Sequence, residues 1–389
     1  MYKTHKVIDF FPLLFVNVFF LPLSILMGMA FKSKKGNFDN FFGMNVNLDK
    51  GLEQIELIKE LNCDDLLIRL PLNDMKNIEQ YKKFIESFED KNIIINILQD
   101  REHIEDTSLL KKNIRIIFST FKGICDSYQI GNAVNQSKWG FFSMKEYLAF
   151  YTTVQSVRNE KFPNYTLIGP GVKGVEMKYN VRALFNSVKI KFDKVSSLMY
   201  VDSQGIPEQS KFLSFDLSKQ IHTLYGLSSL AIKSKNDIIL SETSWHIKGE
   251  KEANEYAVSE DEQAMYMLRY YLLALGTKRV QGVYWFQLIS STFGLTYLKK
   301  GKIEKRKSFY VYKTMLEFLK LCKVEKYSEA NGLHVLTCKN VKGKKLDIVW
   351  VKDSNITVEL TEFNEVFDMY GNQMKKNIKI TKYTHPITE

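Results

Sequence analysis

The stretch "DIILSETSWH", residues 237–246, has the form of a buried strand that ends at a carboxylate. Aliphatic residues follow Asp237, and Glu242 stands where the apolar run stops. Similar short apolar runs recur along the chain, at residues 41–46, 66–72, 93–98, 127–132, 166–171, 196–201 and 282–288. Continuous apolar character, without alternation, is typical of parallel strands that are covered on both faces. These runs therefore predict a parallel sheet.

Helical stretches separate the predicted strands. Apolar residues recur at helical spacing in residues 50–62, 143–160 and 260–276, and a last helix is expected at 309–322. Eight strand and helix pairs predict a (β/α)8 TIM barrel, whose usual length of about 250 residues fits this span. A doubly wound open sheet would give a similar alternation, but no glycine-rich phosphate-binding fingerprint follows the first strand.

The pattern changes after the barrel, which we assign to residues 38–323. Short strand-like segments separated by turns such as Asn331-Gly332 occur at residues 333–339, 345–352, 355–362 and 377–383. They predict a small C-terminal β domain, similar to a sandwich, over residues 324–389.

An uncharged apolar segment, residues 10–31, lies near the amino terminus. As a helix at about 1.5 Å per residue it would be about 33 Å long, enough to cross a bilayer. A transmembrane anchor is the leading interpretation. A cleaved signal peptide with Gly28-Met29-Ala30 at its end, or a true start at Met27 or Met29, are alternatives. Lysines stand on both sides of the segment, so they do not settle its orientation.

Composition narrows the classes of function. The 389 residues carry a net charge of +11, but no basic run interleaved with aromatic residues and no nucleic-acid motif accompanies it, so we expect no nucleic-acid partner. The four cysteines, Cys63, Cys125, Cys322 and Cys338, lack metal-ligand spacing and are interpreted as buried thiols, with a Cys322 to Cys338 disulfide left open. No motif implies a metal or an organic cofactor.

Polar and aromatic residues gather where the predicted strands end, which is where barrel enzymes carry their chemistry. Indole faces pack against sugar rings, and amide, guanidinium and carboxylate groups bind hydroxyls, so this mixture predicts a carbohydrate site. For each tryptophan alone, core packing is the competing interpretation. The candidate binding residues are Arg69, Asn132, Lys138, Trp139, Tyr200, Asp202, Trp245 and Trp285.

The chain resembles the clan A glycoside hydrolases, retaining (β/α)8 enzymes. "IILSETSWH" is similar to their nucleophile strand, "VYWFQL" to their eighth strand and "LLIRLPL" to their second, and "YQIGNAVN" is similar to the strand that carries the acid/base. The resemblance covers roughly residues 38 to 383. It implies Glu242 as nucleophile, Trp285 as floor of the sugar site, Arg69 as a buried arginine and Asn132 as the partner of the sugar 2-hydroxyl.

One position departs from the family pattern, because Ala133 stands where the family has its acid/base glutamate. A retaining mechanism needs two carboxyl groups about 5 Å apart. Another strand end could supply the acid, and the available groups are Glu176, Asp202, Glu208 and His246. Otherwise the substrate has a good leaving group, such as a phosphate-linked sugar, or the protein binds carbohydrate without catalysis.

We therefore expect a glycoside hydrolase-like protein acting on a glycan, for which a bacterial surface polysaccharide is one candidate. The rival is a non-catalytic carbohydrate-binding pseudoenzyme in polysaccharide assembly, in which Glu242 only pairs with Arg69. We expect a membrane-anchored or exported protein of a bacterial cell envelope, or a cytoplasmic one if the chain starts at Met27 or Met29.

Overall fold

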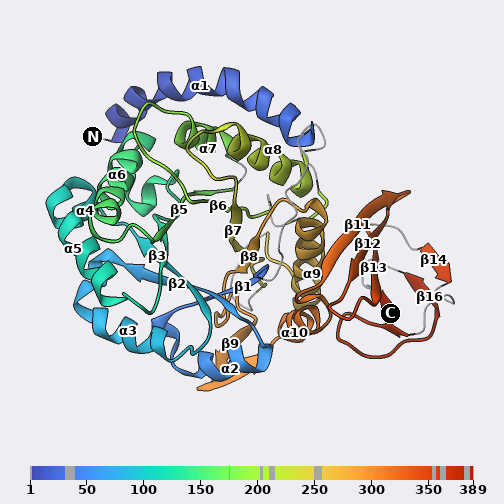
Figure 1. The fold of residues 1–389 in the computed structure, drawn as a ribbon. Helices are drawn as coiled ribbons and strands as arrows, with labels where there is room; N and C mark the ends of the chain where they lie inside the picture. Colours follow the sequence, from blue (N-terminus) through green and yellow to red (C-terminus); the bar gives the residue numbers. More distant parts are fainter. Residues whose placement is uncertain are drawn as a thin grey trace.

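The structure is a computed structural model of the 389-residue chain. It describes residues 2–30, 40–174, 176–201, 205–209, 215–248, 256–352, 356–359, 365–380 and 386–388. Its centre is a closed barrel of parallel strands in which each strand pairs with the next and the last pairs with the first (Figure 1). The strands are β1 (Phe42–Val46), β2 (Asp65–Pro71), β3 (Asn92–Leu98), β4 (Ser127–Ile130), β5 (Thr166–Lys173), β6 (Lys194–Leu198), β7 (Ile238–Thr243) and β8 (Gly282–Trp285). The predicted (β/α)8 barrel is confirmed.

Helices surround the barrel and connect successive strands (Figure 1). Side-chain caps begin several of them: Asp106 accepts hydrogen bonds from two backbone N–H groups at the start of α5, and Ser259 and Glu262 form a capping box at α9. The helices are α2 (Glu53–Leu61), α3 (Ile78–Glu86), α4 (Arg101–Glu105), α5 (Thr107–Thr120), α6 (Met144–Lys161), α7 (Met177–Leu184), α8 (Leu217–Leu230), α9 (Glu260–Thr277) and α10 (Lys307–Leu319), with short 3₁₀ turns at Leu48–Lys50, Leu72–Asn77 and Ser137–Trp139.

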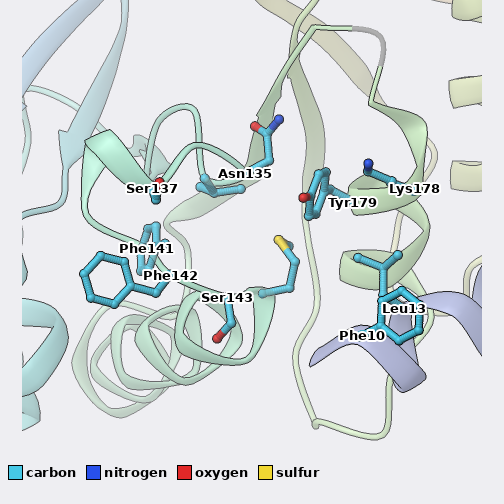
Figure 2. Close-up of a pocket in the computed structure, with 11 residues that line it drawn as sticks. Phe10, Leu13, Asn135, Ser137, Phe141, Phe142, Ser143, Lys178 and Tyr179 are labelled. Atoms are coloured by element: carbon cyan, nitrogen blue, oxygen red, sulfur yellow. The ribbon is translucent and has the colours of Figure 1, made fainter. Parts of the chain in front are cut away.

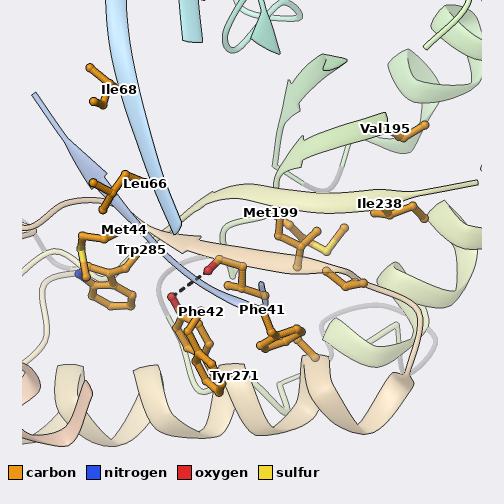
Figure 3. Close-up of a cluster of buried hydrophobic side chains, with 14 of the residues drawn as sticks. Phe41, Phe42, Met44, Leu66, Ile68, Val195, Met199, Ile238, Tyr271 and Trp285 are labelled. Atoms are coloured by element: carbon orange, nitrogen blue, oxygen red, sulfur yellow. Dashed lines mark hydrogen bonds between the residues drawn. The ribbon is translucent and has the colours of Figure 1, made fainter. Parts of the chain in front are cut away.

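Apolar side chains of the strands and of α9 form the core between the barrel and its helices. Figure 3 shows part of this cluster, with Tyr271 of α9 reaching from the helix up to the barrel strands. The Tyr271 ring stacks on Phe42 at 5.6 Å between centroids, and its hydroxyl donates a 3.2 Å hydrogen bond to the Val283 carbonyl. Each fully buried large apolar side chain contributes about 1.5–3 kcal/mol relative to exposure, so this layer holds α9 on the barrel.

Antiparallel sheets follow the barrel strands. β9 (Thr296–Lys299) and β10 (Lys302–Lys305) form a hairpin before α10, and β14 (Ile356–Glu359) pairs with β16 (Asn377–Ile380). The main C-terminal sheet has the order β11-β12-β13-β17-β15. Its strands are β11 (Lys323–Ala330), β12 (Leu333–Lys339), β13 (Lys345–Val351), β15 (Val366–Phe367) and β17 (Ile387–Thr388).

The turn between β11 and β12 has the predicted chemistry. Asn331 and Gly332 have φ values of 51° and 77°, the pair of left-handed conformations that a tight hairpin requires. The sequence analysis did not predict β11 as a strand, because its residues are mostly polar and exposed or partly exposed. The cysteines are free, buried thiols, so Cys322 and Cys338 are not bridged.

Helix α1 (Tyr2–Ala30) lies outside the ring of barrel helices and packs along α7 and α8 (Figure 1). Its segment Phe10–Ala30 is long and apolar enough to cross a membrane. The predicted apolar helix is therefore present, and it is docked on the side of the barrel.

Candidate active site

Three side chains from different strands converge on the Glu242 carboxylate. Glu242 lies in β7 and is only 2% exposed. Arg69 of β2 forms an ion pair with Oε1 through Nη2, Asn132 beyond β4 donates to Oε1 from Nδ2 at 3.2 Å, and Tyr200 beyond β6 donates to Oε2 at 2.9 Å. Because the carboxyl ends of parallel barrel strands share one rim, residues far apart in sequence meet here.

The Asn132 amide is oriented by two polar residues inside the barrel. Asn96 of β3 and Gln129 of β4 donate to Asn132 Oδ1 at 3.1 Å and 3.3 Å, so its Nδ2 group points to Glu242. Gln99 holds the Asn132 backbone, accepting from its N–H at 2.9 Å and donating to its carbonyl at 2.8 Å. Asn96 and Gln129 were missed as site residues. Their only signal in the sequence is that each is a polar residue within an apolar strand.

Positively charged side chains surround the buried carboxylate of Glu242. The Arg69 guanidinium lies 4.2 Å from the Phe286 ring centroid, and the Lys173 ammonium lies 4.9 Å from the Tyr200 ring centroid. Burial lowers the pKa of Lys173 below its ordinary value; the charges of Lys138 and Arg69 lower it further, while Glu242 opposes them. Burial, followed by the Glu242 charge, raises the pKa of Tyr200 well above its usual value, so its hydroxyl keeps the proton that it donates.

Lys173 is a third functional candidate that sequence reasoning missed. It ends β5, next to the strand whose end would carry the family's acid. Asn135 fixes its backbone, accepting from the Lys173 N–H at 2.8 Å and donating to its carbonyl at 3.0 Å. The loop after β4 is thereby tied to the end of β5.

Ala133 occupies a sharp turn directly after Asn132. Its φ of 47° is left-handed, and the residue is 1% exposed. Glu242 takes its hydrogen bonds within the described residues from Arg69, Asn132 and Tyr200, none of which is a carboxyl group. A second carboxylate in contact with the first is therefore not found in this part of the chain.

The residues proposed as substitute acids interact with groups other than Glu242. Glu208 is held by Arg269 at 2.8 Å and 2.6 Å and accepts a 2.9 Å hydrogen bond from Trp350 of the C-terminal sheet. Glu176 accepts from Asn135 and lies 3.4 Å from the Lys178 ammonium. His246 is 8% exposed and meets the Phe293 ring edge to face. Asp202, proposed both as acid and as binding residue, lies outside the described residues.

The three tryptophans predicted at the rim differ in their exposure to solvent. Trp139 is 39% exposed, with the Lys138 ammonium 6.0 Å from its ring centroid. Trp245 and Trp285 are fully buried and stacked at 6.1 Å, and Trp245 Nε1 donates to the Gly205 carbonyl. Trp245 thus packs in the core, and its assignment as a binding residue stays a prediction. The buried Nε1 of Trp285 has no hydrogen-bond partner among the described residues, and its place at the sugar site stays a prediction.

A cavity of about 350 Å³ lies beside this rim (Figure 2). Its walls come from the loop after β4, the start of α7 and the first part of α1. Val134 and Asn135 of the wall directly follow Ala133 in the chain, so the cavity adjoins the loop that carries Asn132. The lining side chains include Phe10, Leu13, Phe141, Met144, Lys178 and Tyr179. Over the described residues, no three His, Cys, Asp or Glu side chains gather as metal ligands would.

The structural neighbours of this chain are clan A glycoside hydrolases, and the chain shares their eight-stranded parallel barrel. A family 39 glycoside hydrolase from the gut symbiont Bacteroides cellulosilyticus WH2 matches with a TM-score of 0.69 at 14% identity, over 91% of this chain and 81% of that one. An α-L-arabinofuranosidase from Thermotoga maritima, in complex with arabinose, matches at 0.63 with 10% identity, over 92% and 97%.

A family 39 β-xylosidase from Caulobacter crescentus matches with a TM-score of 0.60 at 11% identity, over 86% of this chain and 84% of that one. No protein-family model and no curated protein matches the sequence. At these low sequence identities, the similarity to these structures shows a shared fold.

Proposed function

We propose that this protein is a glycoside hydrolase that cleaves a carbohydrate substrate with Glu242 as the nucleophile. The observation that carries the proposal is the convergence of Arg69, Asn132 and Tyr200 on this one buried carboxylate. An isolated carboxylate would be too costly to bury, whereas Glu242 has an ion pair and two hydrogen bonds that compensate for the water it loses. An ionised carboxylate at the rim is what attack on an anomeric carbon needs.

The chemistry follows from these contacts. A Glu242 oxygen forms a bond to the anomeric carbon while the bond to the leaving oxygen breaks, and the electron pair departs with that oxygen. Water then attacks the anomeric carbon, gives up a proton to solvent or to the group that protonated the leaving oxygen, and releases the Glu242 carboxylate, which gives a retained product. Asn132, held by Asn96 and Gln129, is placed to bind the sugar 2-hydroxyl, the role implied by the family resemblance.

Departure of the leaving group is the step that Ala133 cannot assist. We propose that Lys173 assists it, either by giving a proton to the leaving oxygen or by stabilising an anionic leaving group such as phosphate. Its lowered pKa favours proton donation, and Arg69, Lys138 and Lys173 together provide the charge that an anionic substrate requires.

A second candidate function is carbohydrate binding without turnover, and Ala133 is the observation that favours it. The partner in either case is a carbohydrate, with a bacterial surface polysaccharide as our candidate. We keep the division into a barrel over residues 38–323 and a β domain over 324–389 as a proposal, together with a location at the cell envelope.

Covalent trapping separates the two candidates. The full chain is incubated with 2-deoxy-2-fluoro glycosides that carry activated leaving groups, including glycosyl phosphates and uronides, and its intact mass is measured. We expect an adduct that maps to Glu242 and is absent from Glu242→Gln, which preserves shape but removes the nucleophile. If a broad panel gives no adduct while sugars still bind, the binding protein is the correct function.

A further inference from the structure

Helix α1 is apolar on both of its sides over residues 10–30. The side that faces the barrel carries the apolar residues Val16, Phe20 and Leu21 together with the small or polar residues Asn17, Ser24 and Gly28, of which Ser24 is fully buried. The opposite side of this segment is exposed and apolar. Its large side chains, 36% to 71% exposed, are Phe10, Phe11, Leu14, Phe15, Val18, Phe19, Leu23, Ile25, Leu26 and Met29. Such a continuous apolar face marks a site that another apolar phase covers.

The inner side of α1 fits its neighbours closely along the helix. Asn17 donates from Nδ2 to the Lys178 carbonyl of α7 at 3.0 Å, and Phe20 stacks on Phe185 at 3.9 Å between centroids. Further along, α1 and α8 meet backbone to backbone. A Cβ atom added to Gly28 would lie 2.1 Å from the His222 carbonyl oxygen, and one added to Gly226 would lie 2.1 Å from the Ser24 carbonyl oxygen. Only glycine permits this approach.

This docking conflicts with a helix that spans a bilayer. A spanning helix would carry α7 and α8, with their charged residues, into the hydrocarbon, or it would have to leave the barrel. A helix lying in the membrane plane keeps its docking contacts and still immerses its outer face. The flanking charges agree: Lys3 and Lys6 precede the apolar segment, and Lys32, Lys34 and Lys35 follow it.

We propose that α1 is an in-plane membrane-binding helix that attaches the α7 and α8 side of the barrel to a lipid surface. The inference does not depend on the proposed glycosidase activity. A bilayer suits the outer face better than a protein partner, since the described outer residues provide no polar group for a hydrogen bond and the lysines at both ends suit anionic headgroups. Phe10 and Leu13 also line the cavity beside the β4 loop, so the membrane surface would adjoin the catalytic rim (Figure 2).

Depth measurement tests the orientation. An environment-sensitive fluorophore is attached to Phe11→Cys, Phe19→Cys or Leu26→Cys in the full chain, and quenching by lipids brominated at different depths is measured in phosphatidylcholine vesicles with phosphatidylglycerol. We expect one shallow depth at all three positions. A deep Phe19 with shallow ends would show a spanning helix and overturn the proposal. Absence of vesicle binding, or probes shielded in a lipid-free dimer, would overturn it too.

A cross-link tests whether the docked helix is the form that binds. Phe20→Cys and Phe185→Cys are joined by a short bismaleimide, with the natural cysteines buried and free. The locked protein should float with vesicles as well as the unlocked one, whereas lost flotation would mean that α1 must leave the barrel, against the proposal. The double variant Phe15→Ser with Phe19→Ser should lose at least tenfold in partition. Its matched control is Leu298→Ser with Val341→Ser, two exposed apolar residues elsewhere on the surface, which should leave partition unchanged.

Discussion

Arg69 of β2 and Glu242 of β7 form an ion pair across the mouth of the barrel, with side chains 17% and 3% exposed. The two residues come from strands that are far from adjacent in the barrel order, so the pair bridges the rim. A pair this well shielded from water is costly to break on one side only, because the remaining charge stays buried.

Replacement of Arg69 should therefore impair Glu242 directly. In Arg69→Met the carboxylate loses its counter-charge and the hydrogen-bond donor that orients it, so we expect the rate of fluoroglycoside adduct formation to fall by about 100-fold. Intact mass against time gives the measurement. An unchanged rate would show that Arg69 does not support the nucleophile, and Arg69→Lys provides the charge-conserving control.

Lys173 should matter according to the leaving group. We expect Lys173→Met to lower kcat/KM by about 100-fold for substrates with poor or phosphate leaving groups, the usual range for a general acid. Dinitrophenyl glycosides, which need no proton, should be little affected. The wild-type rate should decline on the alkaline side at a pH below the ordinary lysine pKa, because burial lowers the pKa of this residue. Equal losses for all leaving groups would indicate a structural role.

Glu208 joins the barrel helix α9 to the C-terminal sheet, and its partners can be removed one at a time. Arg269 is fully buried, so Arg269→Met leaves Glu208 without a counter-charge and should cost about 3–5 kcal/mol of unfolding free energy. Trp350→Phe removes one hydrogen bond to a charged group and should cost about 1.5–3 kcal/mol. Urea unfolding provides both values. Combining Arg269→Met with Glu208→Gln should recover part of the loss, and strictly additive losses would contradict the coupling.

His222 on α8, under α1, should make stability depend on pH. Burial, followed by the charge of Arg279, lowers its pKa from 6.5 to about 4. In the unfolded chain His222 binds a proton as the pH falls below 6.5, whereas in the folded protein it does so only near pH 4. The contribution of His222 to stability is therefore full above pH 6.5 and is lost as the pH falls towards 4. At pH 5.5 the loss should be about 1 kcal/mol. In urea unfolding, His222→Gln should not show this loss of unfolding free energy at low pH. An identical pH profile of stability in the two proteins would refute the assignment of the loss to His222.

Much of the barrel could be predicted because each buried strand is a short, uniformly apolar run between amphipathic helices. Glu242, Arg69 and Asn132 could be found because strand ends share one rim. Lys173 could not, since it follows Gly171 in a segment whose exact strand end depends on pairing with β6. The burial of Trp245 could not be predicted, because the sequence shows its place after a strand and not the direction of its ring. The docking of α1 on the barrel could not be predicted, because the sequence of an apolar segment does not show which helix its glycines contact.

The contact of Glu208 with Trp350 bears on how this chain could have evolved. Glu208 lies in the chain between β6 and α8 and is paired with Arg269 of the barrel helix α9, yet one of its hydrogen bonds comes from a strand of the terminal sheet. Recombination that exchanged the sheet for another module would remove the Trp350 hydrogen bond from this buried carboxylate. The two parts are therefore expected to have been inherited together, as one unit of selection.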